Sequence, residues 1–585
     1  MRRTFALAAA AAAFLATAAP ATPGDDFARL LQDHYAWLLR ENPTSATALG
    51  VRDYDDRIDD ISPAARERRV REAQAFLQRI ERIPAAGLSQ SDRVNRAILK
   101  RGLEEAVEAN RFGQRNMLFT TYYGWHQGFA GMANGLPFRT KADYESYLTR
   151  IAQYPQLNDQ ALALTAEAVR GGYVLPCSVL TGYERTISGV IVEDPAKSRF
   201  YEPFTRARPV DVSEAEWRRM QERARRTIAD VLNPAYAKHR DFYTAGYAPK
   251  CAKSDSISAQ PGGREYYAFR VRQETTTDLT PDRIHQLGLA EVRRIRAAME
   301  RVAKEAGFKT REAFIADLRT NPKYFAATPE ALLQVSGITA KRIDGHMPSL
   351  FGRLPRLPYG IKPIPAETAE GTTTAYYGQG SAESGIAGTY YVNTSKLNQR
   401  PLWEIPALTL HEAVPGHHHQ IALQQELEMA PFRKNFTSFT AFTEGWALSA
   451  ESLGEEMGLY DTPPTRMGQL SYQMWRAARL VVDTGIHSKG WDKARAVAFM
   501  RENTALTEAN IDAEVNRYIS WPGQALGYMI GAIRIRDLRA RAEKELGGRF
   551  DIRRFHDAVL GQGSVPLDVL ETQIVEWIAA EKKRA

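Results

Sequence analysis

Beyond residue 21, the 585-residue chain lacks any apolar run long enough to span a bilayer, which takes about 20 residues. It also lacks internal repeats at solenoid periods, and its Gly-rich stretch GQGSAESGIAG (378–388) is without the Lys-Ser/Thr pair of a phosphate-binding loop. The net charge is +8, but basic residues are scattered among acidic ones and no nucleic-acid recognition motif accompanies them. These absences argue against a membrane span after the N-terminus, a repeat array, a P-loop enzyme and a nucleic-acid partner.

The N-terminus is the one strongly apolar segment. It reads MRRTFALAAAAAAFLATAAPATPGDD, with two arginines, an apolar stretch and then small residues in an Ala-x-Ala order. That order is typical of a secretory signal peptide, here residues 1–21, with the mature chain beginning near residue 19 or 22. The sequence therefore predicts an exported protein, periplasmic or secreted.

Cysteine is scarce. The chain has only Cys177 and Cys251. In an oxidising compartment a lone pair is expected to form one disulfide, whereas the alternative is two separate buried thiols.

Strand signals are also few, since only EYYAFRVRQ (265–273) and GTYYVNTS (388–395) are rich in Tyr and Val. Elsewhere apolar residues recur at three- and four-residue spacing, which predicts helices over residues 25–50, 64–82, 91–110, 143–170 and 213–246. The Gly-rich QPGGREYY (260–267) marks a boundary between an N-terminal helical half, about 22–260, and a C-terminal half, about 261–585. The expected fold is mostly α, with one small β-sheet.

HEAVPGHHHQ (411–420) holds four of the chain's eleven histidines. It begins like the zinc-hydrolase motif His-Glu-x-x-His, but Pro415 occupies the fifth position. In a regular helix His417 lies about 240° around from His411, and His418 lies on the same face about 10 Å along the axis, so neither shares an ion with His411. Pro415 and Gly416 offer a solution, because a break there lets His417 turn back towards His411. The alternative is a solvated polar turn.

A third ligand is available in FTAFTEGWALSAESLGEEMG (439–458), a periodic helix. Glu444 stands there between Phe442 and Trp446, and a carboxylate in such surroundings is costly to bury unless it meets a charge or a metal. Glu444 is thus the expected ligand beside His411 and His417, with Glu412 as the base that activates water. For Glu451, two turns on, the sequence leaves open a supporting role and a solvated carboxylate.

Two further segments carry candidate residues. The segment YQMWRAARLVVDTGIHSKGW (472–491) places Arg479, Asp483 and His487 four residues apart on one helical face. His487 is therefore a catalytic candidate that would stabilise an oxyanion. The alternative is a structural ion-pair ladder. In DAEVNRYISWPGQALGY (512–528), Tyr518 is a second catalytic candidate, and Arg517 and Tyr528 are candidates for substrate binding. Tyr391, in the second predicted strand, is another, because an exposed strand edge would pair with an extended peptide.

These stretches resemble a bacterial family catalogued as a domain of unknown function, number 885. The matching pieces run from about residue 42 to 570 and include LTLHEAVPGHHHQ, EGWALSAE, RAARLVVDTGIH, EVNRYISWPGQALGY and FHDAVLGQGSVPL. The family is similar to mostly helical zinc metallopeptidases of the thimet-oligopeptidase and Taq-carboxypeptidase kind, which hold zinc in a deep cleft. The resemblance implies one Zn²⁺ held by His411, His417 and Glu444, with Glu412 as base. One departure is Ser449, where the family often has Tyr.

The expected function is that of an exported zinc metallopeptidase acting on peptides. Alternatives are a zinc hydrolase of a non-peptide amide or ester, and a non-catalytic periplasmic binding protein on the same fold.

Overall fold

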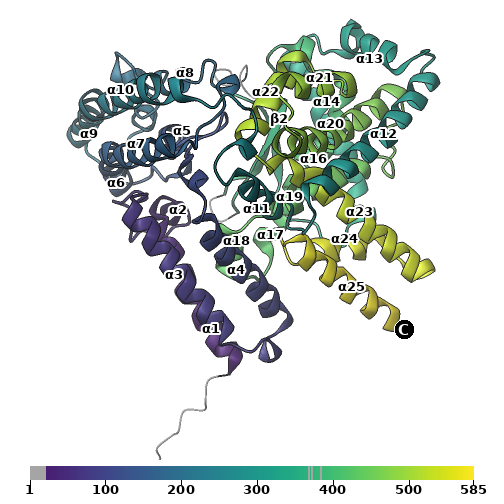
Figure 1. Cartoon of the computed structure of the whole chain (residues 1–585), viewed down its shortest axis with the longest axis horizontal. Coiled ribbons are helices and arrows are strands. Elements are labelled where there is room, and N and C mark those ends of the chain that lie inside the picture. The colour runs from purple at the N-terminus through teal and green to yellow at the C-terminus, as the bar shows by residue number, and fades with distance from the viewer. Residues whose placement is uncertain (1–21, 366–368, 370–372, 383–384, 585) are drawn as a thin grey trace, which may run out of the picture.

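The computed structural model describes residues 22–365, 369, 373–382 and 385–584. The predicted signal peptide lies outside the described residues. Within them, no helix combines the length and the apolar character needed to cross a membrane. The fold is mostly helical with one small sheet, as predicted. Figure 1 shows the helices up to α10 on one side of the molecule and most of those from α11 on the other, with α18 beside α4.

The N-terminal helices follow the predicted ranges, but prolines divide two of them. Predicted helix 25–50 is interrupted at Asn42, since a proline disfavours helical backbone in the residue before it. Predicted helix 143–170 is interrupted at residues 152–153, because Pro155 has no N–H to bond to the carbonyl of Ile151. The helices are α1 (Pro23–Glu41), α2 (Pro43–Ala48), α3 (Pro63–Glu81), α4 (Gln90–Ala109), α5 (Trp125–Ala130), α6 (Lys141–Ile151), α7 (Tyr154–Gly171), α8 (Arg185–Ser188), α9 (Glu214–Thr227) and α10 (Asn233–Phe242).

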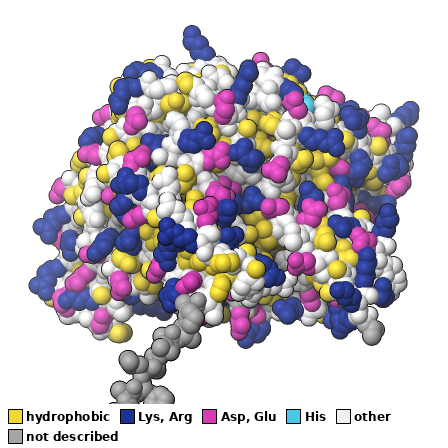
Figure 2. All heavy atoms as spheres, turned by 60° about the horizontal axis from the view of Figure 1, so that its bottom comes forward, with side chains coloured by type: hydrophobic (Ala, Val, Ile, Leu, Met, Phe, Trp, Pro, Cys, Tyr) yellow, Lys and Arg dark blue, Asp and Glu magenta, His cyan; other side chains and the backbone are white. Residues whose placement is uncertain are grey.

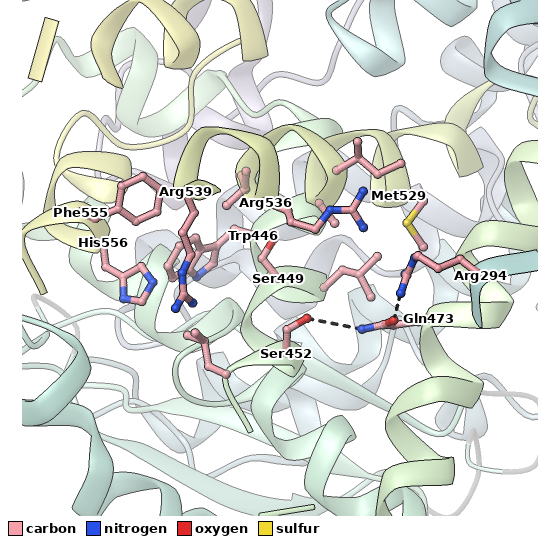
Figure 3. A pocket seen from close by; sticks show the side chains of 15 residues that line it. Arg294, Trp446, Ser449, Ser452, Gln473, Met529, Arg536, Arg539, Phe555 and His556 are labelled. Atoms are coloured by element: carbon pink, nitrogen blue, oxygen red, sulfur yellow. Dashed lines mark hydrogen bonds between the residues drawn. The ribbon is translucent and has the colours of Figure 1, made fainter. Parts of the chain in front are cut away.

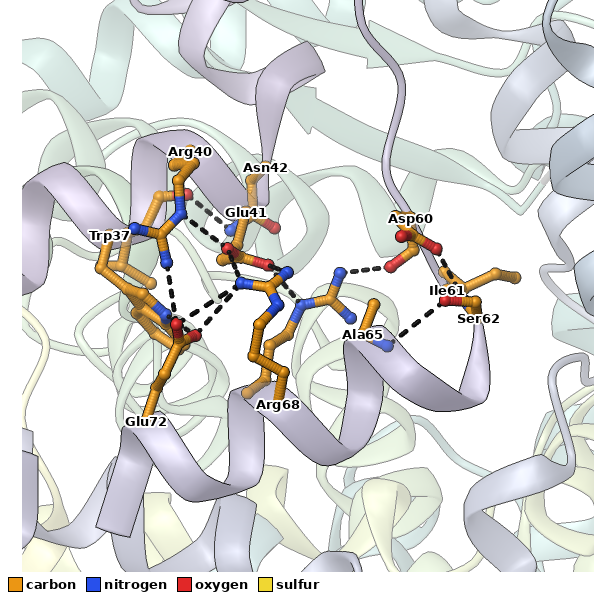
Figure 4. A network of polar contacts seen from close by, with 12 residues as sticks. Trp37, Arg40, Glu41, Asn42, Asp60, Ile61, Ser62, Ala65, Arg68 and Glu72 are labelled. Carbon is orange, nitrogen blue, oxygen red and sulfur yellow. Dashed lines mark hydrogen bonds and ion pairs between the residues drawn. The ribbon is translucent and has the colours of Figure 1, made fainter. Parts of the chain in front are cut away.

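A buried carboxylate joins α1 to α3 (Figure 4). Glu41, at the end of α1, accepts hydrogen bonds from Arg68 at 2.8 and 2.9 Å, from Arg69 at 2.9 Å and from Arg40 at 2.9 Å. Glu72 takes further bonds from Arg40 and Arg68. The three guanidinium groups thus surround one carboxylate at the helix junction.

This junction predicts an acid-dependent loss of stability. Burial raises the pKa of Glu41, but Arg68, Arg40 and Arg69 outweigh it and lower the pKa from 4.5 to about 2. Because the folded-state pKa is the lower one, the stabilisation is fully present above pH 4.5 and is lost as the pH falls towards 2. We expect Glu41→Gln to lower the melting temperature at pH 7 and the difference from wild type to shrink between about pH 5 and 2. Glu67→Gln, at an exposed pair on α3, is the control, and an equal pH trend for both variants would contradict the prediction.

The predicted disulfide is confirmed. Cys177 and Cys251 are bonded, and they link the segment after α7 to the segment after α10. The chain is also paired there through the main chain, since Cys177 N donates to Ala252 O at 2.9 Å and Ala252 N to Leu175 O at 3.0 Å. The bond therefore lies wholly within the N-terminal half.

The C-terminal half packs around α20, a long helix that is buried over most of its length. Its helices are α11 (Gly263–Thr275), α12 (Pro281–Glu305), α13 (Arg311–Thr320), α14 (Pro329–Leu350), α16 (Ile405–Glu412), α17 (His417–Glu426), α18 (Pro431–Phe436), α19 (Thr440–Ser452), α20 (Pro463–Lys489), α21 (Lys493–Asn503), α22 (Glu508–Ser520), α23 (Gly527–Leu546), α24 (Ile552–Leu560) and α25 (Leu567–Lys583).

Helices α19 and α23 cross at two glycines. A Cβ on Gly445 would lie 2.5 Å from the Cα of Gly531, and a Cβ on Gly531 would lie 1.8 Å from the carbonyl oxygen of Ala441. Only glycine allows the two backbones to come this close. The crossing fixes α19, and with it Glu444.

The prediction of a strand at 265–273 is wrong, because these residues lie within α11. Tyr267 and Val271, four apart, are both buried, and the hydroxyl of Tyr267 donates to Asp483 at 2.6 Å. Tertiary packing therefore overrides the strand preference of Tyr and Val.

The one sheet of the described residues has three strands, β1 (Tyr359–Pro363), β2 (Ala375–Gly378) and β3 (Gly388–Val392), in the order β1-β3-β2. β3 runs parallel to β1 and antiparallel to β2. The prediction of a free edge at 388–395 is wrong, because β3 is paired on both sides. Tyr391 stacks on Tyr376 of β2 at a ring distance of 4.8 Å.

The charged surface is mixed. Figure 2 shows Lys and Arg side chains interspersed with Asp and Glu over one face. Several are helical pairs four residues apart, such as Arg218 with Glu214 at 2.6 Å and Arg541 with Glu545 at 2.7 Å.

Candidate metal centre

The helix carrying His411 breaks where the sequence predicts. α16 ends at Glu412, Ala413 and Gly416 leave helical geometry with ψ of −114° and −127°, and α17 starts at His417. The break turns His417 back over His411, so that their rings lie 4.8 Å apart at 90°.

Gly416 makes the reversal sterically possible. A Cβ at this position would lie 1.9 Å from the carbonyl oxygen of His411 and 2.4 Å from that of Leu410. Both atoms belong to the α16 backbone, which has little room to move. No side chain fits between the two helices here.

The three predicted ligands converge. Glu444 Oε2 lies 3.5 Å from His411 Nε2 and 3.4 Å from His417 Nε2, and one ligand atom of each residue lies within 4.8 Å of the others. His411 is buried, whereas the side chains of His417 and Glu444 are 12% and 21% exposed. One side of the cluster is thus accessible.

These spacings fit a metal ion better than direct hydrogen bonds. Neighbouring ligand atoms of a tetrahedral zinc site are about 3.3–3.4 Å apart for bonds of about 2.0–2.1 Å. An N–H···O hydrogen bond is shorter, about 2.7–3.2 Å. Glu444 Oε2 and His417 Nδ1 are also buried without a hydrogen-bond partner among the described residues. A carboxylate oxygen so placed is costly unless a cation compensates it.

The electrostatics of the cluster favour positive charge. Burial lowers the pKa of His411, but the carboxylates of Glu444, Glu451 and Glu412 outweigh it and raise the pKa to about 9. Burial likewise opposes ionisation of Glu444, yet His417 and His411 hold its pKa well below the usual range.

Glu451 supports the first histidine. Its side chain is fully buried, and it accepts a 2.8 Å hydrogen bond from His411 Nδ1. This contact fixes the ring so that Nε2 faces Glu444. A carboxylate behind a ligand histidine is the usual way to fix its tautomer and raise its basicity. Of the two interpretations of Glu451, the structure supports the first.

We expect Glu451→Gln to weaken zinc binding about 10- to 100-fold, the usual effect of removing such a carboxylate. Chelator competition on the full chain measures it. Glu455→Gln, an exposed glutamate one turn later, is the control. Equal zinc affinities for both variants would contradict the supporting role of Glu451.

Glu412 is the last residue of α16 and is 8% exposed. Its carboxylate makes no hydrogen bond to another described residue, so both oxygens are left without a protein partner there. His418 is otherwise engaged, since Nδ1 meets the Tyr377 hydroxyl at 3.0 Å and Nε2 meets Leu357 O at 3.0 Å. His419 is buried against Phe351, at a ring distance of 4.5 Å. Of the three consecutive histidines, His417 therefore belongs to the cluster, whereas His418 and His419 pack against other residues.

His487 has no nitrogen to offer a substrate. Nδ1 accepts from the main-chain N–H of Ile257 at 3.1 Å, and Nε2 donates to the carbonyl of Tyr518 at 2.9 Å. Arg479 and Asp483 do not bond to it or to each other: Asp483 accepts from Tyr267 and from the N–H of Gly523. The other interpretation, a structural ion-pair ladder, does not hold either, because Arg479, Asp483 and His487 bond to other elements and not to one another.

Tyr518 belongs to a buried network around Glu514, a residue that the sequence analysis missed. The Tyr518 hydroxyl donates to Glu514 at 2.8 Å and accepts from Arg479 Nε at 3.1 Å and Trp475 Nε1 at 3.2 Å, which fills its bonding capacity. Glu514 also pairs with Arg479 at 2.9 Å. The sequence signal for Glu514 was its position four residues before Tyr518, which places both side chains on one face of the helix.

Arg517 and Tyr528 lie at the border of this network. Arg517 donates to the Tyr528 hydroxyl at 3.1 Å and to Gln524 at 2.6 Å, while its guanidinium stands over the ring of Tyr122. Tyr122 is 49% exposed, whereas the side chain of Arg517 is 13% exposed and Tyr528 is 8% exposed, so both substrate-binding candidates are largely buried.

A cavity of about 200 Å³ lies against another part of α19. Figure 3 shows Trp446 and His556 at one end and Arg294 with Gln473 at the other. Ser449, the departure from the family pattern, lines this cavity and not the metal cluster. The indole N–H of Trp446 donates to Pro415 O at 2.8 Å, which links the cavity wall to the helix break.

Comparison with known proteins gives relatives over nearly the whole chain. A solved structure described as a "putative lipoprotein" from Colwellia psychrerythraea is 26% identical, with a TM-score of 0.90 over 96% of this chain and 100% of that one. A second, a "putative lipoprotein of unknown function" from Shewanella oneidensis, is 17% identical, with a TM-score of 0.72 over 94% of this chain and 99% of that one, and so shows the fold alone.

No curated protein gives a significant match. The model of one family, described as "Bacterial protein of unknown function (DUF885)", matches residues 43–574. The chain therefore belongs to this DUF885 family of bacterial proteins.

Proposed function

We propose that the chain is an exported zinc-dependent hydrolase that cleaves peptides. The observation that carries this proposal is the convergence of His411, His417 and Glu444 at metal-ligand spacing around a buried, otherwise unpartnered carboxylate oxygen. The resemblance of the family to helical zinc metallopeptidases points the same way.

Each residue has a distinct task in this function. Two imidazoles and one carboxylate leave a fourth position open, as hydrolytic zinc sites do. A zinc ion bound there supplies a Lewis acid for a substrate carbonyl and makes water easier to deprotonate. Glu412, adjacent to His411 and free of hydrogen bonds, accepts the proton and later returns it to the leaving amine. Glu451 keeps His411 in one orientation.

Export is part of the proposal. It rests on the signal-peptide pattern of residues 1–21 and on the description of the Colwellia psychrerythraea relative as a "putative lipoprotein". The disulfide is the kind of bond that persists outside the cytoplasm.

The test begins with metal analysis of the purified full chain, followed by digestion of a peptide library and of a panel of non-peptide amides and esters. We expect one zinc per chain and peptide cleavage that a chelator abolishes and added zinc restores. Failure to bind zinc would contradict the proposal. Turnover of amides or esters alone would indicate a different hydrolase, and zinc binding without turnover a binding protein.

A further inference from the structure

A second, more polar cavity, of about 410 Å³, lies between the two halves of the chain. We call it the bridging cavity. Its walls come from α4, the loop 117–123, α11, the start of α19 and the turn after α22, and they include Glu105, Tyr123, Arg270, Glu274, Thr440 and Trp521. The loop is tied to the turn by Thr121 N, which donates to Ser520 Oγ at 3.2 Å, and by the edge-to-face contact of Tyr123 with Trp521 at 5.2 Å.

The bridging cavity and the candidate metal centre share helix α19. Thr440 lines the cavity and stands one helical turn before Glu444, on the same face of α19, which corresponds to about 6 Å along the helix axis. Thr440 Oγ1 donates to Glu274 Oε2 at 3.0 Å, which fixes that carboxylate at the wall. A side chain of a substrate whose reacting bond lies at Glu444 would have to extend about one turn along α19 to enter this cavity.

The charges of the bridging cavity favour a cation. Arg270 is already neutralised, because it is bonded to Glu274 and to Gln273 and contacts Pro522 O at 3.4 Å. Among the described residues, Glu105 has one hydrogen bond, a long contact of 3.4 Å from Gln273 Nε2. Among the residues that line the cavity, Arg270 and Glu274 cancel, so Glu105 contributes the net negative charge of the walls. Burial raises the pKa of its carboxyl group, and the Gln273 contact and the nearby Arg101 partly offset that effect.

Aromatic rings add to this preference. Tyr123, Tyr266, Phe439 and Trp521 line the same space. Ring faces attract ammonium and guanidinium groups, and they accommodate the apolar stem of a Lys or Arg side chain.

We propose that the bridging cavity is a specificity subsite that takes a cationic side chain of the substrate, with Glu105 as its anionic anchor. This inference rests on the proposed function, because it assumes that the chain binds a peptide substrate. The ligand class is a short peptide with Arg or Lys beside the cleaved bond.

Two matched peptide sets test the subsite. They are identical except that one carries arginine and the other citrulline, its uncharged isostere, at each position in turn. With the zinc-loaded wild-type chain, we expect kcat/KM to be about tenfold higher for the best arginine peptide than for its citrulline partner, mainly through KM. Glu105→Gln should remove that difference and leave the citrulline peptide unchanged. Glu104→Gln, the exposed neighbour paired with Lys100 at 3.5 Å, is the matched control and should preserve it.

Calorimetric binding of the same peptides to the zinc-loaded Glu412→Gln chain separates the two proposals, because it needs no turnover. If arginine peptides bind preferentially and Glu105→Gln abolishes the preference, the subsite stands even when wild type cleaves nothing, and the proposed function alone fails. Equal binding of arginine and citrulline peptides, or tighter binding of a glutamate peptide, would overturn the subsite whether or not peptides are cleaved.

Discussion

Glu412→Gln is expected to retain one zinc per chain and to lose about 10²- to 10⁴-fold in kcat, the usual contribution of a general base. Glutamine keeps the size and the buried position of the side chain but cannot accept a proton. Because Glu412 is not among the three converging ligands, the metal should stay. Metal analysis and steady-state kinetics on the same preparation measure both quantities.

The ligand variants complete this comparison. Glu444→Gln and His417→Ala should lose zinc and activity together, since two remaining ligands bind a metal weakly. His418→Ala should keep zinc and lower only the melting temperature, because His418 bonds to Tyr377 and Leu357 O. The assignment fails if Glu412→Gln releases the metal while His417→Ala leaves zinc and turnover intact.

Gly416→Ala is expected to be as damaging as loss of a ligand. The added methyl group would lie 1.9 Å from the carbonyl oxygen of His411, so α17 must shift away from α16 and carry His417 with it. We expect zinc affinity to fall at least about a hundredfold and the melting temperature to drop by a few degrees, since overpacking costs about 1–3 kcal/mol.

Gly337→Ala is the control for this substitution. Gly337 lies inside α14, where an added methyl group would meet no atom within 4 Å, and alanine favours helix more than glycine does. It should leave zinc binding unchanged and raise the melting temperature slightly. If Gly416→Ala behaves in the same way, the close approach of the two helices is not required for the centre.

Much of the candidate centre could be predicted from local sequence. The helix break followed from the Pro415-Gly416 pair, because a regular helix fails to bring His411 and His417 together. Glu444 was recognisable as a carboxylate in an apolar helical turn. These arguments need only helical geometry and the cost of burying charge, so they hold without knowledge of the tertiary fold.

The remaining assignments depended on contacts between distant segments. His487 looked reactive on its own helix, but Ile257 and the carbonyl of Tyr518 occupy its nitrogens. The segment 265–273 has strand composition, yet packing against α20 makes it a helix. Strand β3 was expected to offer an edge, but its neighbours are set by sheet order, which local patterns do not specify.

The candidate ligands all lie between residues 411 and 444, whereas the bridging cavity takes walls from α4 and the loop 117–123. The proposed anionic anchor, Glu105, thus lies far from the candidate ligands in the sequence, although Thr440 and other C-terminal residues complete the cavity. Substitutions in the N-terminal half can change which peptides are accepted without disturbing the ligands, and exchange of residues 105–123 between relatives offers a route to transfer preference as a module.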